Sequence, residues 1–311
     1  VSRPPGACVM TAVDNRLDAE LTSAPTEGID AFDTPQERAP HPWTVWVSAA
    51  TLALIVGYAA LAPLLAPTSA HSIDLLASRQ GPSAAHWFGT DQSGRDLFVR
   101  VAQGLRVSLT IAVACSLLST VIGLLVGTIA AVFGGWVDAV LMRFSDALNA
   151  LPHLLLGVVF LAFFPGSIVA IVLSIALTHW TQVARIVRSE ALTARSTEYV
   201  EAAYLAGASR WEVARCHLVP AALGQALVAI VLLTPHAIWH ETTLSFLGLG
   251  LAPDRASLGT LLAISRGEIL IGNWWMLVFP ALLLVVASLA VAGVARAAQE
   301  KWAPLSDRNL S

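Results

Sequence analysis

The chain has 311 residues, of which 56% are hydrophobic and 13% are charged, and its formal net charge is −3. Soluble domains carry about 25% charged residues, so this composition excludes an ordinary soluble globular protein. Long uncharged runs separate the charged residues, as in membrane proteins. Only helices and closed barrels satisfy all their backbone hydrogen-bonding groups in lipid. The sequence lacks the short alternating strands of a barrel. We therefore expect an all-α polytopic membrane protein.

The uncharged runs predict six membrane-spanning helices, because a bilayer requires about 17–25 apolar residues for each. The expected spans are residues 43–66, 107–132, 148–164, 168–184, 221–240 and 274–295, with an earlier start near Val140 as the alternative for the third. The third and fourth share one uncharged run between Asp146 and Arg185, which a Pro-Gly turn divides. Residues 1–42 and 297–311 are expected to be cytoplasmic tails, the first of them disordered.

Arginine and lysine positions predict the orientation, because the cytoplasmic segments of membrane proteins are richer in both. With both termini in the cytoplasm, the inside segments hold twelve such residues and the outside segments hold six. The outside segments are then residues 67–106 and residues 241–273, the second lying within a five-helix core of residues 107–296. Residues 241–273 are apolar and rich in glycine, and they are a candidate re-entrant piece.

Several chemistries are excluded by what the sequence lacks. The single lysine, Lys301, has no glycine-rich loop before it, so any ATP hydrolysis must occur on another chain. The spans hold no carboxylate apart from Glu241, which counts against an ion-coupled symporter working alone. His240-Glu241 begins a zincin motif, but Leu244 stands where the second histidine is required. The three cysteines, Cys8, Cys115 and Cys216, form no disulfide framework or zinc motif.

Residues 198–220 predict two short helices separated by a glycine. Gly207 permits a backbone with positive φ, and Ser209 is a helix N-cap with Glu212 three residues on, as in a capping box. Pro220 is expected to end the second helix and to start the fifth span. On pattern alone, such an amphipathic hairpin either lies on lipid headgroups or docks into a groove of another protein.

This loop also carries a family resemblance. Glu201-Ala202-Ala203, followed by Gly207 and then by Pro220, resembles the EAA loop of ABC-importer permeases. Six further segments, in the same order, are similar to the C-type permeases of dipeptide, oligopeptide and nickel importers. They are residues 89–96, residues 106–109, residues 133–138, Met142-Arg143 with Asp146, residues 150–152 and residues 244–250.

The resemblance extends from about His86 to Pro280, and three departures affect what it implies. Val219 stands where the family usually has leucine, residues 256–259 replace a Ser-Trp-Gly, and residues 292–298 replace the usual end of the last span. These departures concern the substrate class and the C-terminal contacts rather than the fold.

The resemblance implies the type I ABC-importer permease fold in a bacterial inner membrane. The implied partners are a second homologous permease in a heterodimer, two subunits that bind ATP and Mg, and an extracytoplasmic solute-binding protein. This chain would be no enzyme, would hold no cofactor and would bind no nucleic acid. It would supply half the pathway for dipeptides or oligopeptides. Alternatives are nickel, haem or another peptide-like solute and, from a different class, a self-sufficient channel or secondary transporter.

Two groups of site residues follow from the resemblance. The ATPase-coupling loop comprises Glu198, Glu201, Ala202, Ala203, Gly207, Ser209 and Pro220, with a merely solvated charge as the alternative for Glu201. The outer signature segment comprises Gly89, Thr90, Asp91, Gly94, Arg95 and Asp96. We expect this segment to be a structural cap in which Asp91 and Asp96 hold Arg95 by charge-assisted hydrogen bonds. Contact with the binding protein is the alternative.

A third group is expected near the pathway or its gate. It comprises His236, His240, Glu241, Ser245, Phe246 and Gly248. His236 and His240 are four residues apart on one helix face, and two such imidazoles can share a metal ion. We favour hydrated or hydrogen-bonded histidines near the outer gate and predict no metal site.

Overall fold

The computed structural model describes residues 42–66, 72–252 and 255–302. Nearly all of the predicted N-terminal tail lies outside the described residues, as does the end of the C-terminal tail. The described part is helical, with two isolated β-bridges. The helices of the bundle are α2 (Pro42–Leu65), α3 (Leu97–Phe133), α4 (Gly135–Ala150), α5 (His153–Phe163), α6 (Ile168–Arg195), α9 (Val219–Phe246) and α11 (Trp275–Trp302). The remaining elements are η2 (Leu75–Ala77), α7 (Glu198–Leu205), α8 (Arg210–Val213), η3 (Ala214–Leu218) and α10 (Leu258–Leu270).

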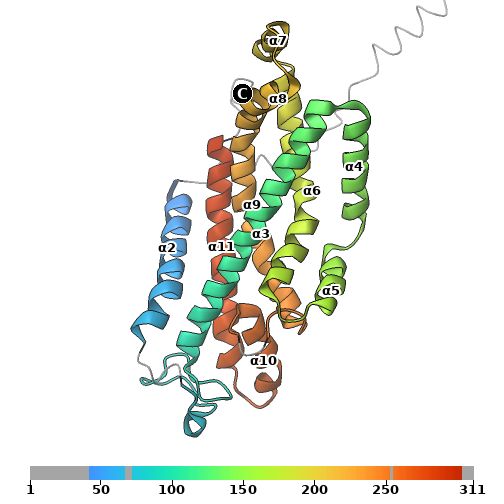
Figure 1. The fold of residues 1–311 in the computed structure, drawn as a ribbon. Coiled ribbons are helices and arrows are strands. Elements are labelled where there is room, and N and C mark those ends of the chain that lie inside the picture. The colour runs from blue at the N-terminus through green and yellow to red at the C-terminus, as the bar shows by residue number, and fades with distance from the viewer. Residues whose placement is uncertain (1–41, 67–71, 253–254, 303–311) are drawn as a thin grey trace, which may run out of the picture. The chain divides into compact units, whose positions relative to one another are not determined.

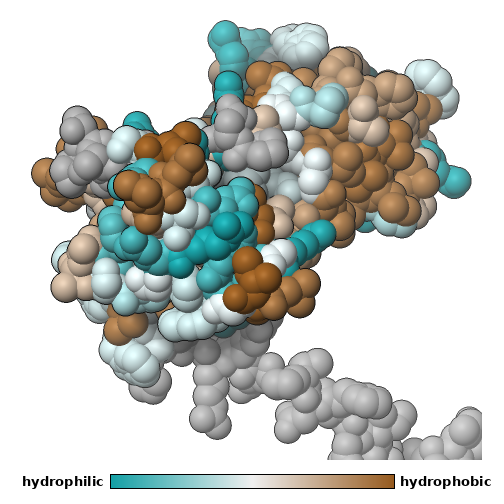
Figure 2. Space-filling model, turned by 90° about the horizontal axis from the view of Figure 1, so that it is seen from below, coloured by the Kyte–Doolittle hydropathy of each residue, from teal (hydrophilic) through white to brown (hydrophobic). Residues whose placement is uncertain are grey.

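α3, α6, α9 and α11 run between two ends of the described bundle (Figure 1). One end carries α7 and α8 and is called the α7 end below. The other carries α10 and the connection from α2 to α3, and is called the α10 end. Seen from the α10 end, hydrophilic residues gather on part of the face beside a broad hydrophobic expanse (Figure 2). This division is expected of a chain whose sides contact lipid.

Five described helices are long and apolar enough to span a membrane, and a bent pair, α4 with α5, makes a sixth candidate. The pair is bent by 85°, so the third expected span, residues 148–164, is not one continuous helix. Leu151 is extended, with φ −87° and ψ 138°, because the residue before a proline avoids the helical region. Pro152 therefore breaks the third span.

Four helices extend beyond the predicted spans, and one of them, α11, continues to Trp302, into the predicted C-terminal tail. α3 begins at Leu97 rather than Val107, because the side chain of Asp96 caps it by accepting from two backbone N–H groups. α6 continues to Arg195, and α9 continues to Phe246. The segments predicted as loops outside the membrane are accordingly shorter than the sequence suggested.

The helix before the fifth span does not end at Pro220 as predicted. α8, η3 and α9 form one helix from Arg210 to Phe246. η3 is a π-helical turn that ends at Leu218, two residues before the proline. A π turn already departs from the usual hydrogen-bond register, and Pro220 has no N–H to contribute to that register. The wider turn lets the chain pass the proline without a break.

The core forms where α3 packs against α6 and α9. Gly123 and Gly127 of α3 allow the closest approach: a Cβ at Gly127 would lie 2.5 Å from the carbonyl oxygen of Ala184. Small residues at such contacts let membrane helices pack backbone to backbone.

We expect Gly127→Ala to destabilise the chain by about 1–3 kcal/mol, because the added methyl group meets backbone that must shift. Gly57→Ala is the matched control, since a Cβ there meets nothing within 4 Å. That control should be neutral or slightly stabilising, by up to about 1 kcal/mol. Thermal unfolding midpoints in detergent measure both, and equal midpoints for the two variants would contradict the packing argument.

Candidate functional site

The connection from α6 to α9 folds as a compact helical hairpin, residues 198–218, called the α7–α8 hairpin below. α7 carries Glu198 and Glu201 in its first turn, where acidic side chains complement the positive end of the helix dipole. It ends in a Schellman arrangement: Ala208 N–H donates to the Ala203 carbonyl, and Gly207 N–H donates to the Tyr204 carbonyl.

The local signals predicted for the turn of the hairpin are confirmed. Gly207 has φ +89°, although an added Cβ would meet nothing within 4 Å. Glycine is therefore required for its backbone conformation and not for space. Ser209 and Glu212 form the predicted capping box at the start of α8.

The hairpin has an inward face and an outward face. Val200, Val213 and Leu218 are fully buried, and Ala203 packs against the same cluster with the ends of α3 and α6. Glu198, Glu201 and Ala202 are exposed, so they form the outward face. Ser209 and Pro220 are exposed as well.

The sequence reasoning missed the most exposed apolar residues of the hairpin. Leu205 is 85% exposed, Trp211 is 64% exposed and Tyr199 is 53% exposed. Trp211 makes an edge contact with Phe133 of α3. The sequence did contain a signal for this exposed apolar surface, because Leu205 and Trp211 stand on either side of Gly207, the turn of the hairpin. Ala202 is exposed as well, and Ala202, Leu205 and Trp211 are together called the apolar tip of the hairpin below.

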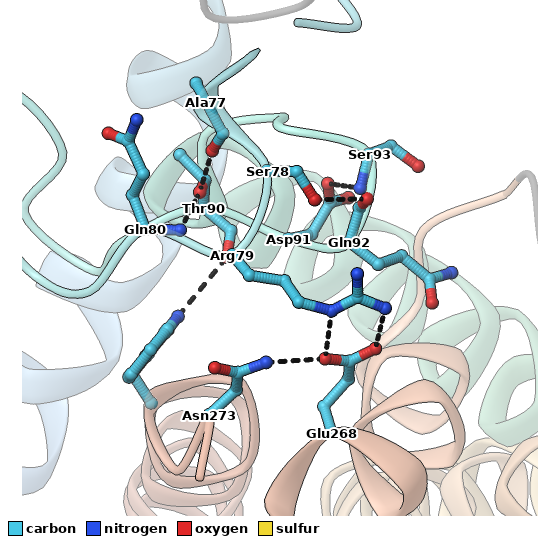
Figure 3. Close-up of polar contacts among 11 residues, drawn as sticks. Ala77, Ser78, Arg79, Gln80, Thr90, Asp91, Gln92, Ser93, Glu268 and Asn273 are labelled. Carbon is cyan, nitrogen blue, oxygen red and sulfur yellow. Dashed lines mark hydrogen bonds and ion pairs between the residues drawn. The ribbon is translucent and has the colours of Figure 1, made fainter. Parts of the chain in front are cut away.

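At the α10 end, the segment of residues 72–96 is a folded cap whose parts are tied by side-chain bonds (Figure 3). The Thr90 hydroxyl donates to the Ala77 carbonyl and accepts from the Gln80 N–H. Trp275 of α11 donates its indole N–H to the Thr90 carbonyl at 3.2 Å. Gly89 and Gly94 have φ of 75° and 73°, values that favour glycine.

The predicted pairing of Arg95 with Asp91 and Asp96 is wrong. Asp91 is buried and its Oδ2 accepts from Arg100 at 2.7 Å. Asp96 caps α3 with Oδ1 and bonds to His86 with Oδ2. Arg95 takes part through its backbone N–H, which donates to Asp91 Oδ1. Arg100 is buried in the first turns of α3, and a buried cation requires a counter-ion more than a half-exposed one does.

A bidentate ion pair fastens this cap to α10 (Figure 3). Arg79 donates Nε–H to Glu268 Oε2 at 2.8 Å and Nη2–H to Oε1 at 2.9 Å. Asn273 donates to Glu268 Oε2 at 2.7 Å. The hydrogen bonds and charge of Arg79 lower the pKa of the Glu268 carboxyl, and the same carboxylate raises the pKa of Arg79.

The lowered pKa of Glu268 predicts a pH-dependent contribution to stability. The bond stabilises the fold above the unfolded carboxyl pKa, about 4.3, and this contribution is lost as the pH falls through the lower folded pKa. The difference in melting temperature between the wild type and Arg79→Gln should therefore be largest near about pH 7 and shrink below about pH 4.3. Thermal scans across that range measure it, with Arg79→Lys as the control that keeps the charge. A constant difference would contradict the assignment.

Two of the residues predicted near the pathway lie in the interior instead. Glu241 is 0% exposed and Ser245 is 2% exposed. Glu241 accepts from Ser108 Oγ at 2.7 Å and from Ser245 Oγ at 2.9 Å. The same serine hydroxyls accept from the N–H groups of Leu258 and Leu251. Glu241 therefore joins α3, α9 and the chain around α10. Phe246 is half-buried and Gly248 is exposed, with φ +84°.

The predicted histidines belong to a larger cluster. His179 of α6 lies between His153 of α5 and His240 of α9, with ring centroids 5.4 and 4.7 Å away. His236 is exposed on α9. No group of three or more potential ligands among the described residues could hold a metal ion. His153 and His179 come from distant parts of the sequence, and no local spacing could have found them.

The helices define a multi-pass α-helical membrane protein with a structured cap at one end and an exposed hairpin at the other. Residues 119–303 match the family described as "Binding-protein-dependent transport system inner membrane component". The chain belongs to this family and is a permease component of an ABC importer. The fold class and the family expected from the sequence are thereby confirmed.

Named relatives agree with this assignment. The chain is 38% identical over 223 residues to the dipeptide transport system permease protein DppC of Bacillus subtilis (strain 168), covering 72% of this chain and 70% of the relative. It is 38% identical over 230 residues to the oligopeptide transport system permease protein OppC of the same organism, covering 74% and 75%. A solved structure of inward-facing MetNI methionine ABC transporter is 19% identical, with a TM-score of 0.48, covering 65% of this chain and 97% of that chain.

Proposed function

We propose that this chain is the membrane-spanning subunit of an ATP-driven importer of dipeptides or oligopeptides, with the type I permease arrangement. A second homologous permease would complete the pathway. Two partner subunits would bind ATP and Mg and hydrolyse the nucleotide, and an extracytoplasmic protein would deliver the solute. Both termini and the α7 end would face the cytoplasm of a bacterial cell, and the α10 end would face outward. The peptide substrate is supported by the relatives DppC and OppC, which are named for dipeptide and oligopeptide transport.

The observation that carries this proposal is the apolar tip of the α7–α8 hairpin. Leu205 and Trp211 are exposed, while the inward face of the same hairpin is packed against the ends of α3 and α6. A partner that bound the tip would move the hairpin as a rigid body, because its other face is already fixed. The force would pass directly into α6 and α9, the helices on either side of the hairpin.

The cluster of His153, His179 and His240, with exposed His236, is our candidate for the pathway surface of this chain. Ionisable side chains within membrane spans face a protein interior or a water-filled cavity, because lipid disfavours them. The outer cap of residues 72–96 is proposed as a structural brace whose internal bonds hold the entrance in shape.

Reconstitution with and without partners tests the function. In proteoliposomes, this chain alone should hydrolyse no ATP and transport nothing. Addition of the second permease, the ATP-binding subunits and the binding protein should give ATP-dependent uptake of a labelled dipeptide. Labelled nickel and haem serve as parallel arms that identify the alternative solutes. Transport by the chain alone would overturn the importer proposal in favour of a channel or secondary transporter.

A further inference from the structure

Arg106 of α3 is an exposed arginine to which the proposed transport function assigns no role. Its backbone carbonyl accepts from Thr110 Oγ1. Its guanidinium has no hydrogen-bond or ion-pair partner among the residues that the structure describes, whereas Arg79 and Arg100 at the same end are both paired. An arginine without a protein anion beside lipid is suited to bind an anion from another source.

Arg106 is expected to lie at the level of the lipid headgroups, on the side of the membrane that the α10 end faces. α3 has 37 residues and is therefore about 55 Å long, whereas the hydrocarbon of a bilayer is about 30 Å thick. The uncharged part of α3 begins at Val107, directly after Arg106. Long basic side chains at this boundary reach toward lipid phosphates.

A groove of about 470 Å³ opens beside Arg106, between α2 and α3. This volume lies in the range of small-molecule sites, about 300–1,000 Å³. The groove is lined by Val56, Ala59, Ala60, Leu64, Arg106, Leu109, Thr110 and Val113. Arg106 supplies the single charge of this lining, and the Thr110 hydroxyl is already bonded within α3. The remaining lining is apolar, with small alanines of α2 making room.

The polar and apolar parts of the groove are ordered along the membrane normal. α2 and α3 run in opposite directions, with Leu64 and Arg106 toward the α10 end (Figure 1). From Arg106 to Val113 the groove continues about 10 Å toward the bilayer centre, and from Leu64 to Val56 about 12 Å. The cation therefore stands at the mouth, and the deeper lining is apolar apart from the Thr110 hydroxyl, which is bonded within α3. A phospholipid has the same order, with a phosphate at the interface and an acyl chain below it.

We propose that this groove binds one phospholipid of the leaflet on the α10 side, with its phosphate on Arg106 and one acyl chain between α2 and α3. The exposed apolar face of α2 beside the groove, where Leu61 and Leu64 are 54% and 73% exposed, would contact neighbouring lipid. The proposal uses the membrane location of the family and does not depend on the transported solute.

The test uses the assembled transporter in vesicles of phosphatidylethanolamine and phosphatidylglycerol, with a phosphatidylglycerol that carries a photoreactive acyl chain. Crosslinks should map to peptides of α2 and α3. Arg106→Gln should reduce this labelling by roughly ten- to hundredfold, the range expected for loss of a charge-assisted hydrogen bond. Arg106→Lys should retain most of it, which would show that the charge and not general folding is responsible.

Two further variants control for geometry and charge. Ala60→Phe fills the groove and should abolish labelling without changing the charge. Arg255→Gln removes an exposed arginine near the start of α10, outside the groove, and should leave labelling unchanged. Equal labelling of the wild type and Arg106→Gln would overturn the proposal. Crosslinks from this groove to the second permease instead of lipid would overturn it as well, and would identify a protein partner for Arg106.

Discussion

Replacing Ala202 by tryptophan is expected to abolish uptake while leaving the permease itself folded. Ala202 lies on the outward face of α7, next to the exposed Leu205. A large ring there makes no clash within the chain but separates the apolar tip from any partner groove. Loss of a central interface contact costs roughly 2–4 kcal/mol, which is about 30- to 1,000-fold in affinity for the ATP-binding subunits.

The measurements are co-purification of the ATP-binding subunits, uptake in cells and the melting temperature of the permease. Ala203→Trp is the informative comparison, because Ala203 packs inward on the buried cluster and its enlargement should lower the melting temperature. Ala202→Ser should behave as the wild type. If Ala202→Trp retained both its partners and its uptake, the hairpin would not be the coupling element.

The α7–α8 hairpin shows which structural features a local sequence signal can predict and which it cannot. The positive φ of Gly207 and the Ser209 capping box depend on residues a few positions apart, so the sequence predicted both. The sequence indicated an amphipathic hairpin, but it did not predict which residues of α7 pack inward, because that depends on where α3 and α6 end. Ala202 and Ala203 are neighbours in the sequence, yet one faces outward and the other packs on the core.

The ion pairs between charged side chains were the features of the structure that the sequence predicted least well. Asp91 is close in sequence to both Arg95 and Arg100, and the nearer arginine was the natural expectation. The fold buries Arg100 beside Asp91 and leaves Arg95 half-exposed, and burial decides which cation requires the carboxylate. The pairing of Arg79 with Glu268 joins residues far apart in the chain and had no sequence signal.

The broken third span, by contrast, had a local signal that the hydropathy pattern concealed. The uncharged residues 148–164 suggested one continuous helix, but Pro152 constrains Leu151 to an extended backbone. Composition therefore indicates which helices are apolar enough to span a membrane, while proline chemistry determines how many straight helices those residues form.

Replacing Glu241 by alanine should be among the most damaging single changes in this chain. The carboxylate accepts from Ser108 and Ser245, whose hydroxyls in turn accept from the N–H groups of Leu258 and Leu251. Its removal leaves two buried hydroxyl donors without acceptors, at about 1–3 kcal/mol each. It also opens a cavity where α3, α9 and α10 meet.

We therefore expect a loss of roughly 3–5 kcal/mol, and a fall in melting temperature of about 6–20 °C at about 2–4 °C per kcal/mol for a chain of this size. Glu241→Gln is the matched control, since its amide oxygen still accepts one hydroxyl and its volume fills the site. It should lose less than half as much. Thermal scans in detergent compare the two variants with the wild type. A melting temperature of Glu241→Ala equal to that of Glu241→Gln would show that the acceptor is dispensable, and would reopen the possibility that Glu241 serves transport and not the joining of three helices.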